Sequence, residues 1–205
     1  MSTVIVIRPG ETEFDQQARI QGDLDLPLSD RGRKQVADVI ERLRGKEIGT
    51  IYASTTEPAR TTARVIADSL GAPVKELEGL GNLNQGLWQG LLLDDIKRKQ
   101  PRVYKQWRDA PESVCAPQGE TCNEAHERVR KALRRPMKKR APFAVVASEP
   151  LATLICCVLR GRGAQLPGPV CGCDDARRVE VIDDLAAVNG HSTPPLESAA
   201  DGTGP

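Results

Sequence analysis

Residues 4–12 of the chain read VIVIRPGET, and this stretch decides the fold. Four consecutive β-branched apolar residues are typical of a strand that is buried on both faces, as in a parallel sheet. Pro9 and Gly10 then end the strand in a sharp turn. In an open α/β sheet, the ligand site lies at the carboxyl ends of the strands. The turn after residue 7 is therefore the first candidate for a functional site.

Further along the chain, predicted strands alternate with predicted helices. Strands are expected at 50–53, 73–77, 143–147 and 178–182, and helices at 29–44, 56–71, 92–107, 120–135 and 150–159. Loops are expected at 79–90 and 110–119. This alternation predicts an α/β three-layer sandwich, with a mostly parallel central sheet and helices on both faces. The pocket should lie where the strand ends at residues 8–10, 53–55 and 147–149 meet.

Length and composition fit one globular domain. The chain has 205 residues, of which 39% are hydrophobic and 28% charged, so we expect a single domain over residues 1–188. Residues 189–205 are rich in Gly, Ser, Thr and Pro, and we expect a disordered tail. The longest nearly apolar run, 151–159, is too short to span a bilayer, and the first residues lack a signal-peptide pattern. We therefore expect a cytoplasmic protein with no membrane partner.

Charge is unevenly distributed along the chain. Residues 97–140 hold 14 Lys or Arg and 5 Asp or Glu, a local charge of +9, although the whole chain carries only +1. One hypothesis is that this basic face binds a polyanion. Stacking on single strands would require aromatic side chains, and only Tyr104 and Trp107 lie in this segment. We therefore favour a solvated face and do not expect a nucleic-acid partner.

The six cysteines do not form a recognisable metal motif. Cys156 and Cys157 lie in an apolar helical stretch, where cysteine acts as a small hydrophobe. Cys171-Gly172-Cys173 could be a redox pair or half of a zinc site, and its role stays open. No C-x-x-C motif or histidine lies nearby, so we expect no metal and no cofactor.

Several sequence blocks follow one another along about residues 3–160. Residues 4–12 resemble an apolar strand followed by Arg-His-Gly-Glu-Thr, and residues 117–121 resemble Pro-x-Gly-Glu-Ser. Further blocks are 19–22, 25–32, 51–54, 59–63, 86–90 and 145–148. In this order the blocks resemble the histidine phosphatase superfamily, whose fold is phosphoglycerate mutase-like. The resemblance implies transfer of a phosphoryl group to a histidine and then to water or another hydroxyl, by positioning and charge neutralisation.

The central catalytic positions of that family are changed in this chain. Pro9 stands where the resemblance places the nucleophilic histidine, and Ser148 where it places the second histidine. Pro58 replaces an arginine, Asn82 replaces the proton donor, and Asp15 replaces an asparagine that contacts phosphate. Of the central groups, Arg8 is retained. These vestigial positions predict a catalytically inactive member of the superfamily, with a binding or assembly role.

We expect the vestigial pocket to suit a small, neutral, polar ligand. If Asp15 lies close to Arg8, it should cancel much of the attraction that this arginine offers a phosphate. The loop 79–90 adds neutral hydrogen-bonding groups. The candidate ligand-binding residues are Arg8, Asp15, Gln21, Gly22, Asn82 and Ser148. The ligand is unidentified, and a protein partner, including a second copy in a homodimer, stays open.

An active enzyme is the remaining alternative. A weak or altered phosphatase or hydrolase, acting on a phosphomonoester or another small substrate, could use Ser148 as its nucleophile. Ser148 would need an adjacent base, and we favour its use as the N-cap of the helix that follows, with Pro150 in the first turn. Neither histidine offers a replacement nucleophile, because His126 is expected to be solvated in a helix and His191 lies in the tail.

Overall fold

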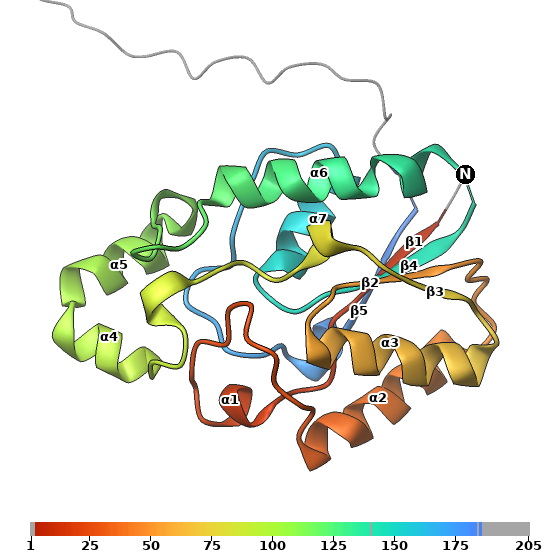
Figure 1. Ribbon diagram of the computed structural model, residues 1–205, viewed down its shortest axis with the longest axis horizontal. Helices are drawn as coiled ribbons and strands as arrows, with labels where there is room; N and C mark the ends of the chain where they lie inside the picture. Colours follow the sequence, from red (N-terminus) through yellow and green to blue (C-terminus); the bar gives the residue numbers. More distant parts are fainter. Residues whose placement is uncertain (1–2, 140, 184, 186–205) are drawn as a thin grey trace, which may run out of the picture.

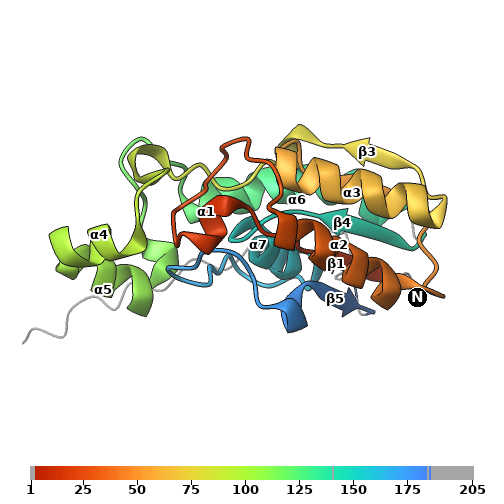
Figure 2. The same cartoon turned by 90° about the horizontal axis from the view of Figure 1, so that it is seen from below.

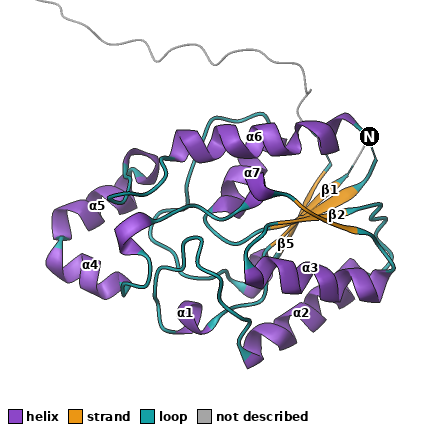
Figure 3. Ribbon diagram, viewed as in Figure 1, coloured by secondary structure: helices purple, strands orange, loops and turns teal. Residues whose placement is uncertain are grey.

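A five-stranded sheet forms the centre of the molecule. The computed structural model describes residues 3–139, 141–183 and 185. The strand order is β3 (Val74–Glu76), β2 (Ile51–Ala53), β4 (Phe143–Val146), β1 (Val4–Ile7), β5 (Val179–Ile182). Figure 3 shows the strands in orange between the helices. The first four are mutually parallel and β5 pairs antiparallel with β1, so the predicted mostly parallel sheet is confirmed.

Helices cover both faces of this sheet, which confirms the predicted three layers. Helices α2 (Asp30–Leu43) and α3 (Glu57–Leu70) lie on one face, and α6 (Cys122–Lys138) and α7 (Leu151–Leu159) lie on the other (Figures 1 and 2). The strands alternate between two cores, because successive side chains point to opposite faces. In β1, Val4 and Val6 pack in the α6–α7 core, whereas Ile5 and Ile7 pack in the α2–α3 core.

The predicted helix over 92–107 is wrong: two helices occupy that stretch. Helix α4 (Leu93–Lys99) ends before Gln100, whose backbone is not helical, and α5 (Pro101–Asp109) starts at the proline. Proline has no N–H to continue the hydrogen-bond ladder, and it disfavours helical geometry in the residue before it. Both helices lie beyond the strand ends, and Trp88 and Trp107 pack together in a third, smaller core there.

Local end signals place the other helices within a few residues of the prediction. The Ser29 hydroxyl accepts a hydrogen bond from the Gly32 N–H at the start of α2, and Gly71 ends α3 in the left-handed conformation. Helix α6 begins at Cys122, two residues later than expected, because Thr121 is its N-cap. One short helix, α1 (Glu13–Gln16), is not in the prediction.

The expected tail, 189–205, lies outside the described residues, and the single domain over 1–188 stays a prediction. Among the helices that the structure describes, none has both the length and the apolar character needed to cross a bilayer.

Candidate active site

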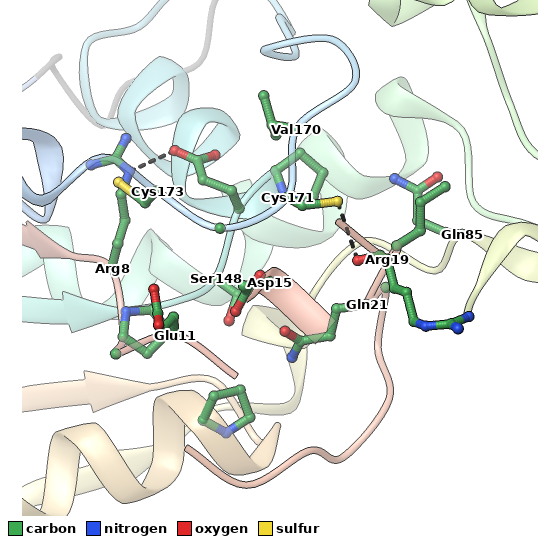
Figure 4. Close-up of a pocket in the computed structure, with 18 of the residues that line it drawn as sticks. Arg8, Glu11, Asp15, Arg19, Gln21, Gln85, Ser148, Val170, Cys171 and Cys173 are labelled. Carbon is green, nitrogen blue, oxygen red and sulfur yellow. Dashed lines mark hydrogen bonds and ion pairs between the residues drawn. The ribbon is translucent and has the colours of Figure 1, made fainter. Parts of the chain in front are cut away.

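A small cavity of about 40 Å³, the inner cavity, lies where the carboxyl ends of β1 and β4 meet the start of α3. Its walls include the following predicted site residues: Arg8, Pro9, Asp15, Gln21, Gly22, Pro58 and Ser148. An outer cavity of about 390 Å³ shares part of the wall with it, including Asp15 and the loop around Gly172. Figure 4 shows Asp15, Ser148 and Gln21 gathered beneath that loop (Figure 4).

Two of the three guanidinium nitrogens of Arg8, Nε and Nη1, donate to acceptors of the protein. Its side chain is 1% exposed, and its Nε lies 2.5 Å from Oε1 of Glu149. Its Nη1 donates to Oε2 of Glu180 at 3.2 Å and to the Arg177 carbonyl at 2.9 Å. Burial alone would lower the pKa of Arg8, but the charge and hydrogen bond of Glu149 outweigh burial and raise that pKa. The expectation that Asp15 neutralises Arg8 is therefore wrong: two glutamates do so.

Glu149 is held in place from the other side by helix α7. Its carboxylate accepts hydrogen bonds from the backbone N–H and the hydroxyl of Thr153, one turn into the helix. The predicted N-cap role of Ser148 is wrong, because its hydroxyl has no hydrogen-bond partner among the described residues and α7 starts three residues later. The carboxylate of Glu149 supplies the acceptor for this helix start instead.

Asp15 caps helix α1, and it forms no ion pair with the Lys or Arg side chains that the structure describes. Its Oδ2 accepts hydrogen bonds from the Thr12 N–H at 2.7 Å and from the Thr12 hydroxyl at 2.9 Å. Burial raises the pKa of Asp15, while the Thr12 hydrogen bonds oppose that rise. A carboxylate that is costly to ionise therefore faces the cavity.

Two buried polar atoms at this cavity lack hydrogen-bond partners in the described part of the chain. They are Nε2 of Gln21, whose residue is 9% exposed, and Oγ of Ser148, whose residue is 7% exposed. The other amide atom of Gln21, Oε1, accepts from the Thr12 hydroxyl at 3.4 Å. An unsatisfied buried polar atom costs roughly 1–3 kcal/mol, so such atoms need an explanation.

The remaining vestigial positions are Asn82, Pro9 and Pro58. Asn82 does not line the cavity: its Nδ2 donates to the carbonyls of Gly22 (2.8 Å) and Glu149 (3.0 Å), and so ties two walls of the site together. Pro9 and Pro58 give the cavity apolar walls that carry no side-chain nitrogen.

The loop before β5 covers the strand ends. Cys171 Sγ donates to the Arg19 carbonyl at 3.2 Å, and the Arg178 guanidinium donates to the carbonyls of Pro9 and Cys173. Burial, with a smaller contribution from Asp15, raises the pKa of Cys171 to about 12. The thiol is therefore protonated at neutral pH. Within the described residues, no group of three or more His, Cys, Asp or Glu is arranged to hold a metal ion.

The predicted site residues do not include three charged residues that close this site: Glu149, Glu180 and Arg178. Glu149 lies at the strand end 147–149, where the pocket was expected, and this was the available signal for it. The other two residues reach the site because β5 pairs antiparallel with β1, and their positions in the sequence did not indicate this.

Two predictions outside the cavity have different outcomes. His126 is partly buried, and its Nε2 is buried with no hydrogen-bond partner in the part of the chain that the structure describes, so the expectation of a solvated histidine is wrong. His191 lies outside the described residues. In the basic segment 97–139, carboxylates pair with Arg98, Arg108, Arg128 and Arg130. Nearby carboxylates thus offset part of the local positive charge.

Comparison with known proteins agrees with this architecture. The sequence profile of the Histidine phosphatase superfamily (branch 1) matches residues 4–170. The chain therefore belongs to the histidine phosphatase superfamily. It is 28% identical over 162 residues to Phosphoserine phosphatase 1 of Hydrogenobacter thermophilus, covering 78% of this chain and 77% of that protein. It is 35% identical over 133 residues to Probable phosphoglycerate mutase GpmB of Erwinia tasmaniensis, covering 65% of this chain but only 62% of that relative.

Solved structures share the fold. The mycobacterial glucosyl-3-phosphoglycerate phosphatase in complex with VO3 superposes with a TM-score of 0.74 at 24% identity, covering 80% of this chain and 84% of the other. Bacillus stearothermophilus YhfR gives a TM-score of 0.72 at 23% identity, with 80% and 82% covered. At these identities the similarity establishes the fold alone.

Proposed function

We propose that this protein is a non-catalytic member of the histidine phosphatase superfamily, which uses its vestigial pocket for binding. The observation that carries the proposal is the buried contact of Arg8 with Glu149, supplemented by Glu180. A carboxylate of the chain itself occupies the guanidinium that would otherwise be available to a phosphate.

The nucleophile position gives a second, independent reason. Phosphoryl transfer through a covalent intermediate needs a nucleophile that an adjacent base or a lowered pKa activates. Pro9 has no side chain that could attack phosphorus. The Ser148 hydroxyl has no hydrogen-bond partner among the described residues, so no base activates it. The neighbouring Glu149 carboxylate is already paired with Arg8.

Assays with three phosphomonoesters test the proposal: p-nitrophenyl phosphate, 3-phosphoglycerate and phosphoserine. The purified protein should release no phosphate above a buffer blank, and no acid-labile phosphohistidine should form. Phosphoserine phosphatase 1 of Hydrogenobacter thermophilus, prepared in the same way, serves as the positive control.

Turnover that an Arg8→Ala variant abolishes would show that the pocket is active, and would refute the proposal. Turnover abolished by Ser148→Ala alone would instead establish a serine-dependent hydrolase. Activity that is equal in the wild type and both variants would come from a contaminant, and the proposal would stand.

A further inference from the structure

We propose that the inner cavity binds an uncharged hydrogen-bonding group, a carboxamide or a hydroxyl, between Gln21 Nε2 and Ser148 Oγ. This inference rests on the proposed non-catalytic role and states which ligand class the pocket takes. It reverses the preference expected of a phosphatase pocket, because the group selected carries no negative charge.

The hydrogen-bonding groups at the cavity are complementary to such a ligand. The Gln21 amide nitrogen supplies donors, and the Ser148 hydroxyl can donate or accept. Oδ1 of Asp15 adds an acceptor. The backbone N–H and hydroxyl of Thr12 donate to Oδ2 of this carboxylate, whereas no donor among the described residues bonds Oδ1. A carboxamide or a hydroxyl both donates and accepts, so such a group matches the donors and acceptors that line the cavity.

Charge at the site works against an anion. The cavity is lined by three arginines, but their guanidinium groups already donate to protein acceptors. Arg8 bonds Glu149 and Glu180, Arg19 bonds the Gly90 carbonyl, and Arg178 bonds Asp175 and two carbonyls. The carboxylates of Glu11, Asp15 and Glu149 also line the site. In the inner cavity an anionic group would meet these carboxylates beside guanidinium groups that already donate to the protein, so an uncharged group is favoured there. Arg177, which has no ion pair among the described residues, lines the outer cavity only.

The two cavities set the size of the ligand. The inner space of about 40 Å³ holds a group of a few heavy atoms, since one water-sized probe takes up about 10–15 Å³. The outer cavity of about 390 Å³ accommodates the remainder of a larger ligand beneath the loop around Gly172. The rings of Pro9 and Pro58 give the inner cavity apolar walls without a polar side-chain atom.

Two pairs of small probes separate uncharged from anionic ligands: acetamide against acetate, and glycerol against glycerol 3-phosphate. Acetamide and acetate have nearly the same shape, so charge is the main difference between them. Saturation-transfer NMR titrations of the wild-type protein should give millimolar binding of acetamide or glycerol. The matching anion should bind at least about tenfold more weakly.

Two cavity variants and one control locate the binding. Gln21→Leu and Ser148→Ala should each weaken binding about fivefold to tenfold, the loss expected for one hydrogen bond. Ser69→Ala, which changes an exposed serine of α3, should have no effect. Far-UV circular dichroism and amide NMR spectra establish that each variant is folded, and a variant that is not folded is replaced by Gln21→Met or Ser148→Gly.

Three outcomes would overturn the inference. They are binding of neither neutral probe, equal or tighter binding of the anions, and neutral binding that both cavity variants leave unchanged. These results differ from failure of the proposed function, which would appear as phosphate release that depends on Arg8. A protein without turnover that also binds no neutral probe would refute this inference alone.

Discussion

The buried pair between Arg8 and Glu149 gives the sharpest test of how this pocket is organised. Glu149→Gln keeps the size of the side chain and a hydrogen-bond acceptor, but it removes the negative charge 2.5 Å from the guanidinium. Arg8 would then be a buried cation whose remaining acidic partner among the described residues is Glu180, at 3.2 Å. We expect the variant to fold with a clearly lower free energy of unfolding.

The magnitude follows from the contacts. Removing one partner of a buried ion pair costs about 3–5 kcal/mol. The glutamine retains one neutral hydrogen bond, worth about 1 kcal/mol, and Glu180 still compensates part of the charge. We therefore expect a loss of about 2–3 kcal/mol. For a chain of this size, that loss lowers the melting temperature by about 5–10 °C.

Urea unfolding, followed by circular dichroism, measures the free energies in a double-mutant cycle. The variants are Glu149→Gln, Arg8→Met and their combination, and the coupling energy between the two side chains should be about 2 kcal/mol. Glu41→Gln is the matched control. Its exposed pair with Arg44 has a distance of 2.8 Å, and the expected loss is below about 0.5 kcal/mol.

A small effect would refute this view of the pocket. If Glu149→Gln and Glu41→Gln lower the free energy of unfolding equally, or if the cycle shows no coupling, then Glu149 does not neutralise Arg8. The arginine would then be free for an anion, and the argument for lost phosphate binding would fail.

Two further predictions concern the same site. Asp15→Asn should be more stable than the wild type at neutral pH. The pKa of Asp15 is higher in the folded protein than in the unfolded chain, so the free energy of unfolding of the wild type should fall as pH rises from about 4 through the raised pKa. The variant should lack this fall. Identical pH profiles of stability for the two proteins would contradict the prediction. A variant in which the family's catalytic groups are restored should hydrolyse no phosphomonoester while Glu149 is retained. It should show turnover when Glu149→Gly is added. Turnover without that last change would show that the glutamate does not block the site. The restoring substitutions are Pro9→His, Asp15→Asn, Pro58→Arg, Asn82→Glu and Ser148→His.

Much of the fold follows from local patterns. The apolar run at 4–7 predicts a strand that is buried on both faces, and its side chains do alternate between two cores. The Ser29 cap and Gly71 mark helix ends that the structure reproduces. Pro101 also indicates a helix break, because the effect of proline on the backbone is local, but the predicted helix over 92–107 continues past it.

The candidate site was predictable in position but not in its contacts. Strand ends converge in any sheet of this class, so Arg8, Gln21 and Ser148 could be assigned to one pocket from the sequence and the family resemblance. The structure separates Asn82 from them, because its amide bonds the backbone of two walls instead of facing the cavity. Side-chain direction depends on the surrounding packing, which a linear sequence does not specify.

The sequence by itself determined what this pocket lacks: Pro9 supplies no nucleophile, whatever the fold around it. Only the tertiary structure decided what took the place of the lost chemistry. Glu149 reaches Arg8 from the turn between β4 and α7, and Glu180 reaches it from a strand more than 170 residues away along the chain. An ion pair depends on distance in space and on exclusion of water, and both arise only when β1, β4 and β5 lie side by side.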